Sequence, residues 1–307
     1  DPRYYLFELI QSAVADGTGC VSIDRFRIRH RQDDLKMRWT GSGFSRLELL
    51  NLFDFLLHPE SDKSQADIMM FARGINSMLH FDPDRVLIAS GNRKRPGVTV
   101  EVRDGGNEIV EIRDVSDFEG VHVFASGMTD SRLPKRKDAN GVLQYSEKQR
   151  IRERCRMPEV SVMFNGRTVS HITWTLHDRR VDFHDVIEIE EDDLYGEIWR
   201  TPSGETPEFD LMTWGVEITS VEPPKGPLEG LSGGVVYNEL NKTADHADIV
   251  RDENYERLWV RLRPYAEKLR GRRARPSYDI ARPGGDQEPM PPEDVHDGLE
   301  SADRLVL

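Results

Sequence analysis

The chain has 307 residues, of which 37% are hydrophobic and 32% charged, and this length predicts two domains because one core rarely fills so long a chain. Its net charge of −13 gives an acidic surface, which argues against a general coating role on DNA or anionic membranes. The two cysteines, Cys20 and Cys155, lie far apart in the sequence, which argues against a disulfide scaffold and favours the cytoplasm. No run of about 20 apolar residues is present, so no membrane-spanning helix is predicted.

The first half of the chain alternates between helical and strand patterns. Apolar residues at helical spacing predict helices at Tyr4–Ala15, Arg46–Leu57 and Ala66–His80. Ser45 and Glu48 form a capping box at the start of the second helix. Shorter alternating runs predict strands at Val21–Ile28, Leu35–Trp39, Val86–Ser90, Val98–Arg103, Ile109–Arg113 and Val121–Ala125. This order predicts an α+β sandwich with helices on one face of a mixed sheet, over residues 1–130.

A basic connector, residues 131–156, follows the first domain. Within it Arg132–Arg156 carries nine Lys or Arg against three acidic residues, and Gln144–Arg156 has a helical pattern. A second domain is predicted over residues 157–270, with a long amphipathic helix, an acidic edge strand and a hairpin among its elements. Its predicted elements are Val160–Phe164, Val169–Leu176, Asp185–Asp193, Gly196–Arg200, Trp214–Thr219 and Glu253–Leu269. Residues 271–307 are basic and then acidic and proline-bearing, which predicts a disordered tail.

Three short motifs in the first domain could together hold a nucleotide. Glu8 and Ser12 lie four residues apart on one helix, so a carboxylate there could orient and deprotonate a water beside a phosphate. Gly41 and Gly43 allow backbone to approach a flat ring. The amides of Arg73–Ile75 could cradle phosphate oxygens if they lie at a helix start. Taken alone, E-x-x-x-S on a helix is more often only a polar face, and a G-x-G after a strand is more often a hairpin or loop turn. Lys63 alone is more often a solvent-facing loop residue.

In this order and at this spacing the motifs resemble the nucleotide pocket of the GHKL superfamily, which includes Hsp90 chaperones, MutL proteins, MORC ATPases and sensor histidine kinases. The resemblance implies a Bergerat-type sandwich followed by a smaller transducer domain related to ribosomal protein S5. It also implies that ATP and magnesium bind if the pocket is open. Glu8 stands at the general-base position of the family motif E-L-x-x-N.

Several positions depart from the family pattern. Ser12 stands where an Asn binds magnesium, and Trp39 stands where an Asp accepts the adenine amino group. Gly41 and Gly43 are in register with the glycines that follow that Asp, and Lys63 resembles the lysine of the lid over the phosphates.

The remaining motifs also match in part. Phe71-Ala72-Arg73-Gly74 resembles F-G-x-G, with Ala72 in place of the first glycine, so Ala72, Arg73 and Gly74 are expected to contact the nucleotide. Met157–Val169 resembles the first hairpin of the transducer domain. Leu240–Asp252 resembles the segment that brings a catalytic Arg to the γ-phosphate, and His246 stands at that position. A shorter and mostly neutral histidine is a poor substitute for arginine.

These departures predict an Hsp90-like module that has lost efficient ATP turnover and serves as a scaffold or conformational switch for partner proteins. The alternative is an active magnesium-dependent ATPase with Glu8 as base, in which ATP closes the Ser61–Gln65 loop. A third possibility is a nucleic-acid module of the MutL or MORC kind that uses Arg132–Arg156. The chain begins with Asp1 rather than Met, so further domains are expected, and no oligomeric state is indicated.

Overall fold

The computed structural model describes most of the chain up to residue 272, and the described elements belong to one unit. Three predicted features lie outside the described residues: the tail from residue 273, His246, and residues 61–62 of the Ser61–Gln65 loop. The strand predicted at Val169–Leu176 also lies outside them from residue 171. The described ranges are 2–29, 32–57, 63–115, 119–129, 131–132, 147–156, 160–170, 185–243 and 248–272.

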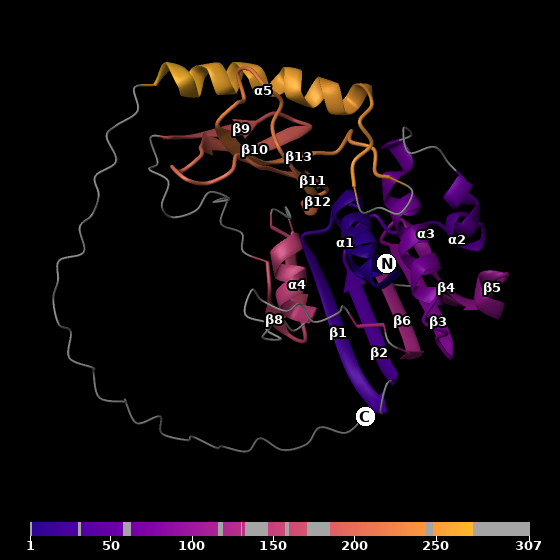
Figure 1. Ribbon diagram of the computed structural model, residues 1–307. Helices are drawn as coiled ribbons and strands as arrows, with labels where there is room; N and C mark the ends of the chain where they lie inside the picture. The colour runs from indigo at the N-terminus through magenta and orange to yellow at the C-terminus, as the bar shows by residue number, and fades with distance from the viewer. Residues whose placement is uncertain are drawn as a thin grey trace, which may run out of the picture. The chain divides into compact units, whose positions relative to one another are not determined.

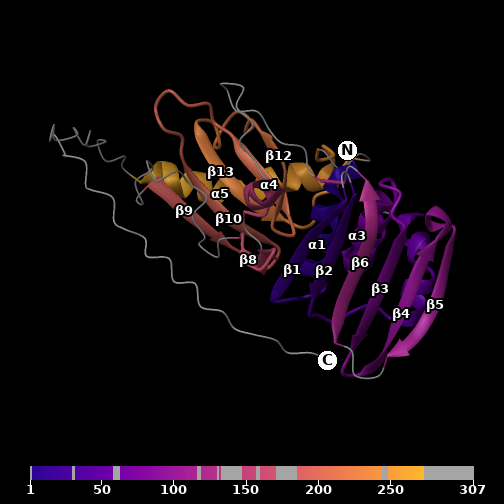
Figure 2. The same ribbon diagram turned by 90° about the horizontal axis from the view of Figure 1, so that it is seen from below.

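The first body is an eight-stranded mixed sheet with the order β5-β4-β3-β6-β2-β1-β7-β8. Neighbouring strands are antiparallel except β1 and β7, which pair in parallel with Cys20 opposite Ser161. Figure 2 shows the strands from β1 to β5 fanned across this body. The strands are β1 Cys20–Arg29, β2 Gln32–Trp39, β3 Arg85–Asn92, β4 Arg95–Arg103, β5 Glu108–Val115, β6 Gly120–Thr129, β7 Ser161–Phe164 and β8 Arg167–Thr168.

Helices α1 (Tyr5–Ala15) and α3 (Ala66–Leu79) pack against each other and share one core with the inward residues of the sheet. All residues of α1 except the last are buried, which is typical of a helix enclosed on every side. The capping box of Ser45 and Glu48 is present, but α2 spans only Arg46–Leu50 and a 3₁₀ helix, Leu52–Leu57, continues it. The predicted sandwich of helices on a mixed sheet is confirmed.

The second body is a five-stranded sheet with the order β12-β11-β13-β10-β9, and α5 (Glu253–Gly271) packs on it through Tyr255, Leu258, Trp259 and Leu262. In Figure 1 this helix runs along the second sheet. Edge strand β9 turns Glu188 and Glu190 outward, as its acidic alternation predicts. The strands are β9 Val186–Glu190, β10 Leu194–Arg200, β11 Phe209–Thr213, β12 Val216–Val221 and β13 Leu231–Tyr237.

Within the connector, helix α4 (Glu147–Arg154) contacts both bodies. Its first residue, Glu147, forms a buried ion pair with Arg25 of β1, with 2.7 Å between Arg25 Nε and Glu147 Oε2. The Arg154 guanidinium lies over the Tyr4 ring, 4.9 Å from its centroid. Beyond the helix, Arg156 pairs with Asp210 of the second sheet. At least two arginines of the connector, Arg154 and Arg156, therefore contact other parts of the same chain.

The hairpin β7–β8 differs from its expected role. Its residues were predicted to open the second domain, but β7 hydrogen-bonds to β1 and extends the first sheet. Parallel pairing between strands so distant in sequence leaves no local pattern, so the hairpin signal could not show which sheet it joins.

Candidate functional site

Three polar residues of α1 gather on one side of the helix, where the second body contacts it. Glu8, Gln11 and Ser12 are all buried, although their side chains are polar. Gln11 Nε2 donates hydrogen bonds to the Thr213 backbone oxygen at 2.9 Å and to Thr213 Oγ1 at 2.7 Å. The E-x-x-x-S pattern therefore does face into the molecule, as predicted from its spacing.

Lys242 completes this cluster, and the sequence reasoning did not single it out. Its Nζ lies 2.6 Å from Glu8 Oε1 and 3.0 Å from Gln11 Oε1. The segment Leu240–Asp252 was expected to bring a cation to this place, but His246 was aligned there. The available signal was that Lys242 and Arg251 are the only lysine or arginine residues of that segment.

The loop that carries Lys242 is fixed at its base. Lys242 forms a β-bridge with Ile249, and Val250 N donates to the Asn241 oxygen at 2.8 Å. Asn241 Nδ2 donates to Asp252, whose carboxylate also caps the first turn of α5. The backbone at Lys242 is therefore tied, through Asn241 and Asp252, to the N-terminal end of α5.

Trp39, at the end of β2, fills the place where the resemblance puts an adenine acceptor. Its side chain is buried and its Nε1 donates to Asp16 Oδ2 at 2.9 Å. The indole meets Phe71 edge-on at 5.9 Å between centroids, and Phe71 packs against Phe44 at 4.6 Å. The indole is thus part of an aromatic cluster and directs its only polar group to a carboxylate.

Gly41 and Gly43 enclose that same carboxylate. Gly43 N donates to Asp16 Oδ1 at 3.0 Å, and a Cβ on Gly41 would overlap the Asp16 side chain. Gly43 has a φ of +62°, and a Cβ there would lie 2.9 Å from Ser90 Oγ. Burial raises the pKa of Asp16 to about 6, against the lowering effect of its bonds from Trp39 and Gly43. The space beside Gly41 is therefore occupied by the Asp16 carboxylate.

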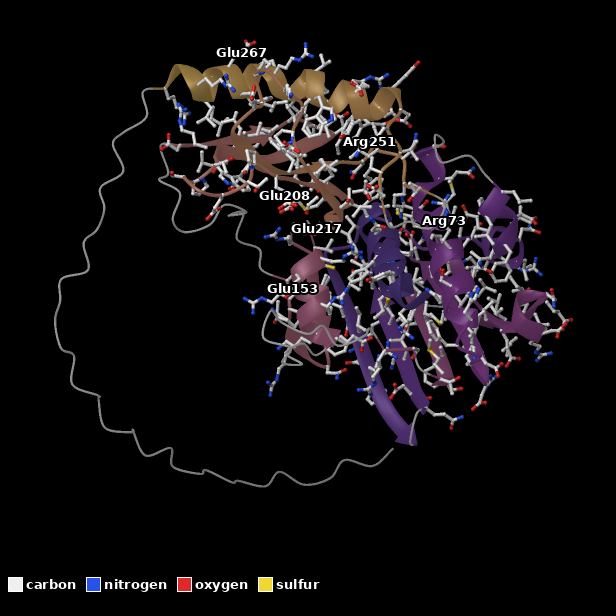
Figure 3. All side chains as sticks on the ribbon, in the orientation of Figure 1. Arg73, Glu153, Glu208, Glu217, Arg251 and Glu267 are labelled. Carbon is white, nitrogen blue, oxygen red and sulfur yellow. The ribbon has the colours of Figure 1, made fainter. Side chains whose placement is uncertain are left out.

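Ala72, Arg73 and Gly74 lie in the middle of α3, which runs without a break from Ala66 to Leu79. The condition that the Arg73–Ile75 amides lie at a helix start is therefore not met, and amides in a helix interior bond within the helix. Figure 3 places Arg73 on this helix. Lys63 begins a short 3₁₀ helix, Lys63–Gln65, that leads into α3.

Gly74 has a packing reason to be glycine. A Cβ there would lie 2.6 Å from Leu9 Cδ2, where α1 and α3 meet. We expect Gly74→Ala to lower the free energy of unfolding by about 1–2 kcal/mol, because overpacking a fully buried contact outweighs the gain in helix propensity. Urea unfolding measures this loss. Gly19→Ala is the control, since a Cβ at Gly19 meets nothing within 4 Å; equal losses in both variants would contradict the packing argument.

Comparison with known proteins gives one informative result. No family model and no curated protein matches the chain. The B subunit of DNA gyrase from Myxococcus xanthus has a similar structure, with a TM-score of 0.50, 14% identity, and coverage of 87% of this chain and 90% of that one. The chain shares the overall fold of that subunit. An identity this low shows the fold alone and carries no residue role with it.

ATP and magnesium, which the resemblance implies, fit these residues poorly as they are arranged. Where the resemblance places an acceptor for adenine, the chain has an indole donor that is already bonded to Asp16. For magnesium, Ser12 Oγ is buried without a partner among the described residues, but no group of three His, Cys, Asp or Glu side chains occurs there. Where the resemblance places the phosphates, Glu8 and Lys242 supply a carboxylate and a cation that are paired with each other. No described helix is long and apolar enough to cross a membrane.

Proposed function

We propose that this chain is a GHKL-type module that has lost efficient ATP turnover and acts as a scaffold or conformational switch for partner proteins. The observation that carries the proposal is the buried Trp39 indole, which is hydrogen-bonded to Asp16 and packed on Phe71. An adenine would have to displace this indole and break its bond to a buried carboxylate. The exocyclic amino group of adenine is a donor, and the indole N–H offers it no acceptor.

The pairing of Glu8 supports the same proposal. A general base needs a lone pair directed at a water, and the Lys242 ammonium lies 2.6 Å from one Glu8 oxygen. The Glu8 oxygen that accepts from Lys242 is engaged in this pair and is not available to a water. Turnover would require Lys242 to leave Glu8 first.

The test is calorimetric titration with magnesium and a non-hydrolysable ATP analogue. We expect no binding heat from the wild type and micromolar to millimolar binding by Trp39→Asp, which removes the bulk and supplies an acceptor. Trp39→Leu is the matched control, because it removes the indole without supplying an acceptor, and it should remain silent. Circular dichroism checks that both variants are folded.

An active magnesium-dependent ATPase with Glu8 as base is the second candidate, since a carboxylate and a cation lie side by side at α1 and would be at hand once Lys242 separates from Glu8. In that case ATP would close the Ser61–Gln65 loop. Micromolar binding by the wild type, with turnover that Glu8→Ala abolishes, would establish this candidate and overturn the pseudo-ATPase proposal.

Nucleic-acid binding through Arg132–Arg156 is less well supported by the structure. Arg150 donates to the Tyr4 hydroxyl at 3.0 Å, and Arg156 contacts Asp210 and Glu217 of the second body. Figure 3 shows Glu217 close to α4. Arginines engaged in this way are not available to phosphates. A steep salt dependence of DNA binding would revive this possibility.

A further inference from the structure

Beyond the site itself, α1 is the place where the second body contacts the first. Strands β11 and β12 are joined by Trp214 and Gly215, both at positive φ of +50° and +72°, which is the geometry of a two-residue hairpin turn. The turn carries its neighbours into the first core, where Val216 is fully buried and Trp214 is partly buried. The β11–β12 turn is therefore an apolar contact between the bodies.

Beside this turn lies the polar cluster of Glu8, Gln11, Thr213 and Lys242. The exposed fractions of the four residues are 7%, 1%, 3% and 6%, so water has little access to any of them. Gln11 links Thr213 to Lys242, because its side-chain amide donates to Thr213 and accepts from Lys242. Glu8 and Gln11 come from the first body, and Thr213 and Lys242 come from the second.

A buried ammonium and a buried carboxylate are stable only while they remain paired. Here the two charges are supplied by different bodies, so the pair exists only while Lys242 and its loop lie against α1. Docking of the second body and burial of the charge pair are thus one event. The pair needs no ligand to complete it, since each charge has its partner within the chain.

We propose that Lys242, Glu8, Gln11 and Thr213 form a clasp that keeps the second body docked on α1 without any nucleotide. The clasp deepens the proposed function, because a scaffold needs a fixed arrangement of its parts. Only this role as part of a scaffold rests on the proposed function; the contacts of the clasp do not. A nucleotide-driven module would need its ligand to bring this lysine into place, whereas here Glu8 holds the lysine. The β11–β12 turn adds apolar contact to the same junction.

Hydrogen–deuterium exchange of the full chain, read by mass spectrometry without nucleotide, tests the clasp. In Lys242→Met and in Glu8→Gln we expect about tenfold faster exchange in α1, in the β11–β12 turn and in the loop at Lys242. Strands β3 and β13, inside each sheet, should exchange as in the wild type. Lys225→Met is the control, because Lys225 is an exposed lysine of the second body.

The double variant Glu8→Gln with Lys242→Met separates a pair from two independent effects. If the charges act as a pair, the double variant exchanges no faster than the faster single variant. Multiplied effects, a uniform rise over both sheets, or exchange equal to that of Lys225→Met would each overturn the clasp. If a single variant fails to fold, Thr213→Val, which removes one acceptor of Gln11, should give a smaller rise at the same segments.

The outcome is independent of the nucleotide test. If the wild type binds the ATP analogue and the clasp variants still loosen the junction, the pseudo-ATPase proposal fails while the clasp stands. If the wild type is silent and the variants leave the junction protected, the clasp fails alone.

Discussion

Arg25→Met is expected to lower the free energy of unfolding by about 3–5 kcal/mol, the loss typical of breaking a buried ion pair from one side. The Arg25 side chain is almost fully buried and donates to Glu147 Oε1 at 2.8 Å, to the Tyr5 hydroxyl at 2.6 Å and to Ser131 Oγ at 2.9 Å. Without the guanidinium, the Glu147 carboxylate stays buried and loses the ion pair with Arg25. Urea unfolding at neutral pH measures the loss.

An exposed pair provides the control for Arg25. Arg93 and Glu119 lie 3.1 Å apart, with side chains 86% and 50% exposed, so Arg93→Met should change stability by less than about 1 kcal/mol. The double variant Arg25→Met with Glu147→Met should recover much of the loss, because a buried pair replaced by apolar groups is often tolerated. A loss in Arg25→Met no larger than that in Arg93→Met would contradict the importance of this anchor for α4.

Trp39→Phe is expected to destabilise the protein by about 1 kcal/mol at pH 4 and by about 2–3 kcal/mol at pH 7.5. The pKa of Asp16 is about 6 in the folded protein and ordinarily 3.8, so the folded state holds this proton more tightly. Stability therefore falls as the pH rises from about 4 to 6, and it stays lower above that window. The indole N–H offsets part of this loss by stabilising the carboxylate, so its removal matters most where Asp16 is ionised.

Unfolding curves at pH 4, 5, 6 and 7.5 check this prediction. Trp259→Phe is a matched control, since Trp259 is equally buried and its Nε1 has no hydrogen-bond partner within the described part of the chain. Its loss should not depend on pH. Asp16→Asn should remove the extra loss of Trp39→Phe at pH 7.5. Parallel pH profiles for the two tryptophan variants would show that the bond to Asp16 contributes little.

Much of the fold was predictable because its signals are local. The helical spacing before Asp16, the capping box of Ser45 and Glu48 and the alternation in β2 each depend on neighbours a few residues away. Strand β13 was missed because it is buried along its whole length and so shows no alternation, and because Gly233 and Gly234 interrupt its apolar run.

The site was less predictable because its contacts join distant segments. Asp16 was not among the predicted site residues, yet Trp39 and Gly43 both bond to its carboxylate. Lys242 is a single lysine in a loop, and its partner Glu8 lies more than two hundred residues away. Gly74 was expected to contact a nucleotide, whereas in the structure it lies inside α3 in close contact with Leu9. Helix crossings and charge pairs of this kind depend on tertiary placement.

The parallel pairing of β7 with β1 has a consequence for synthesis and for fragment design. Val21 of β1 pairs with Val162 of β7, so about 140 further residues must be synthesised before β1 can pair with β7. Until then a nascent chain presents an open strand edge, which is a template for pairing with other chains. A fragment cut near residue 130 would keep that edge permanently, and we expect it to aggregate. An expression boundary after Ser170 retains the covering hairpin.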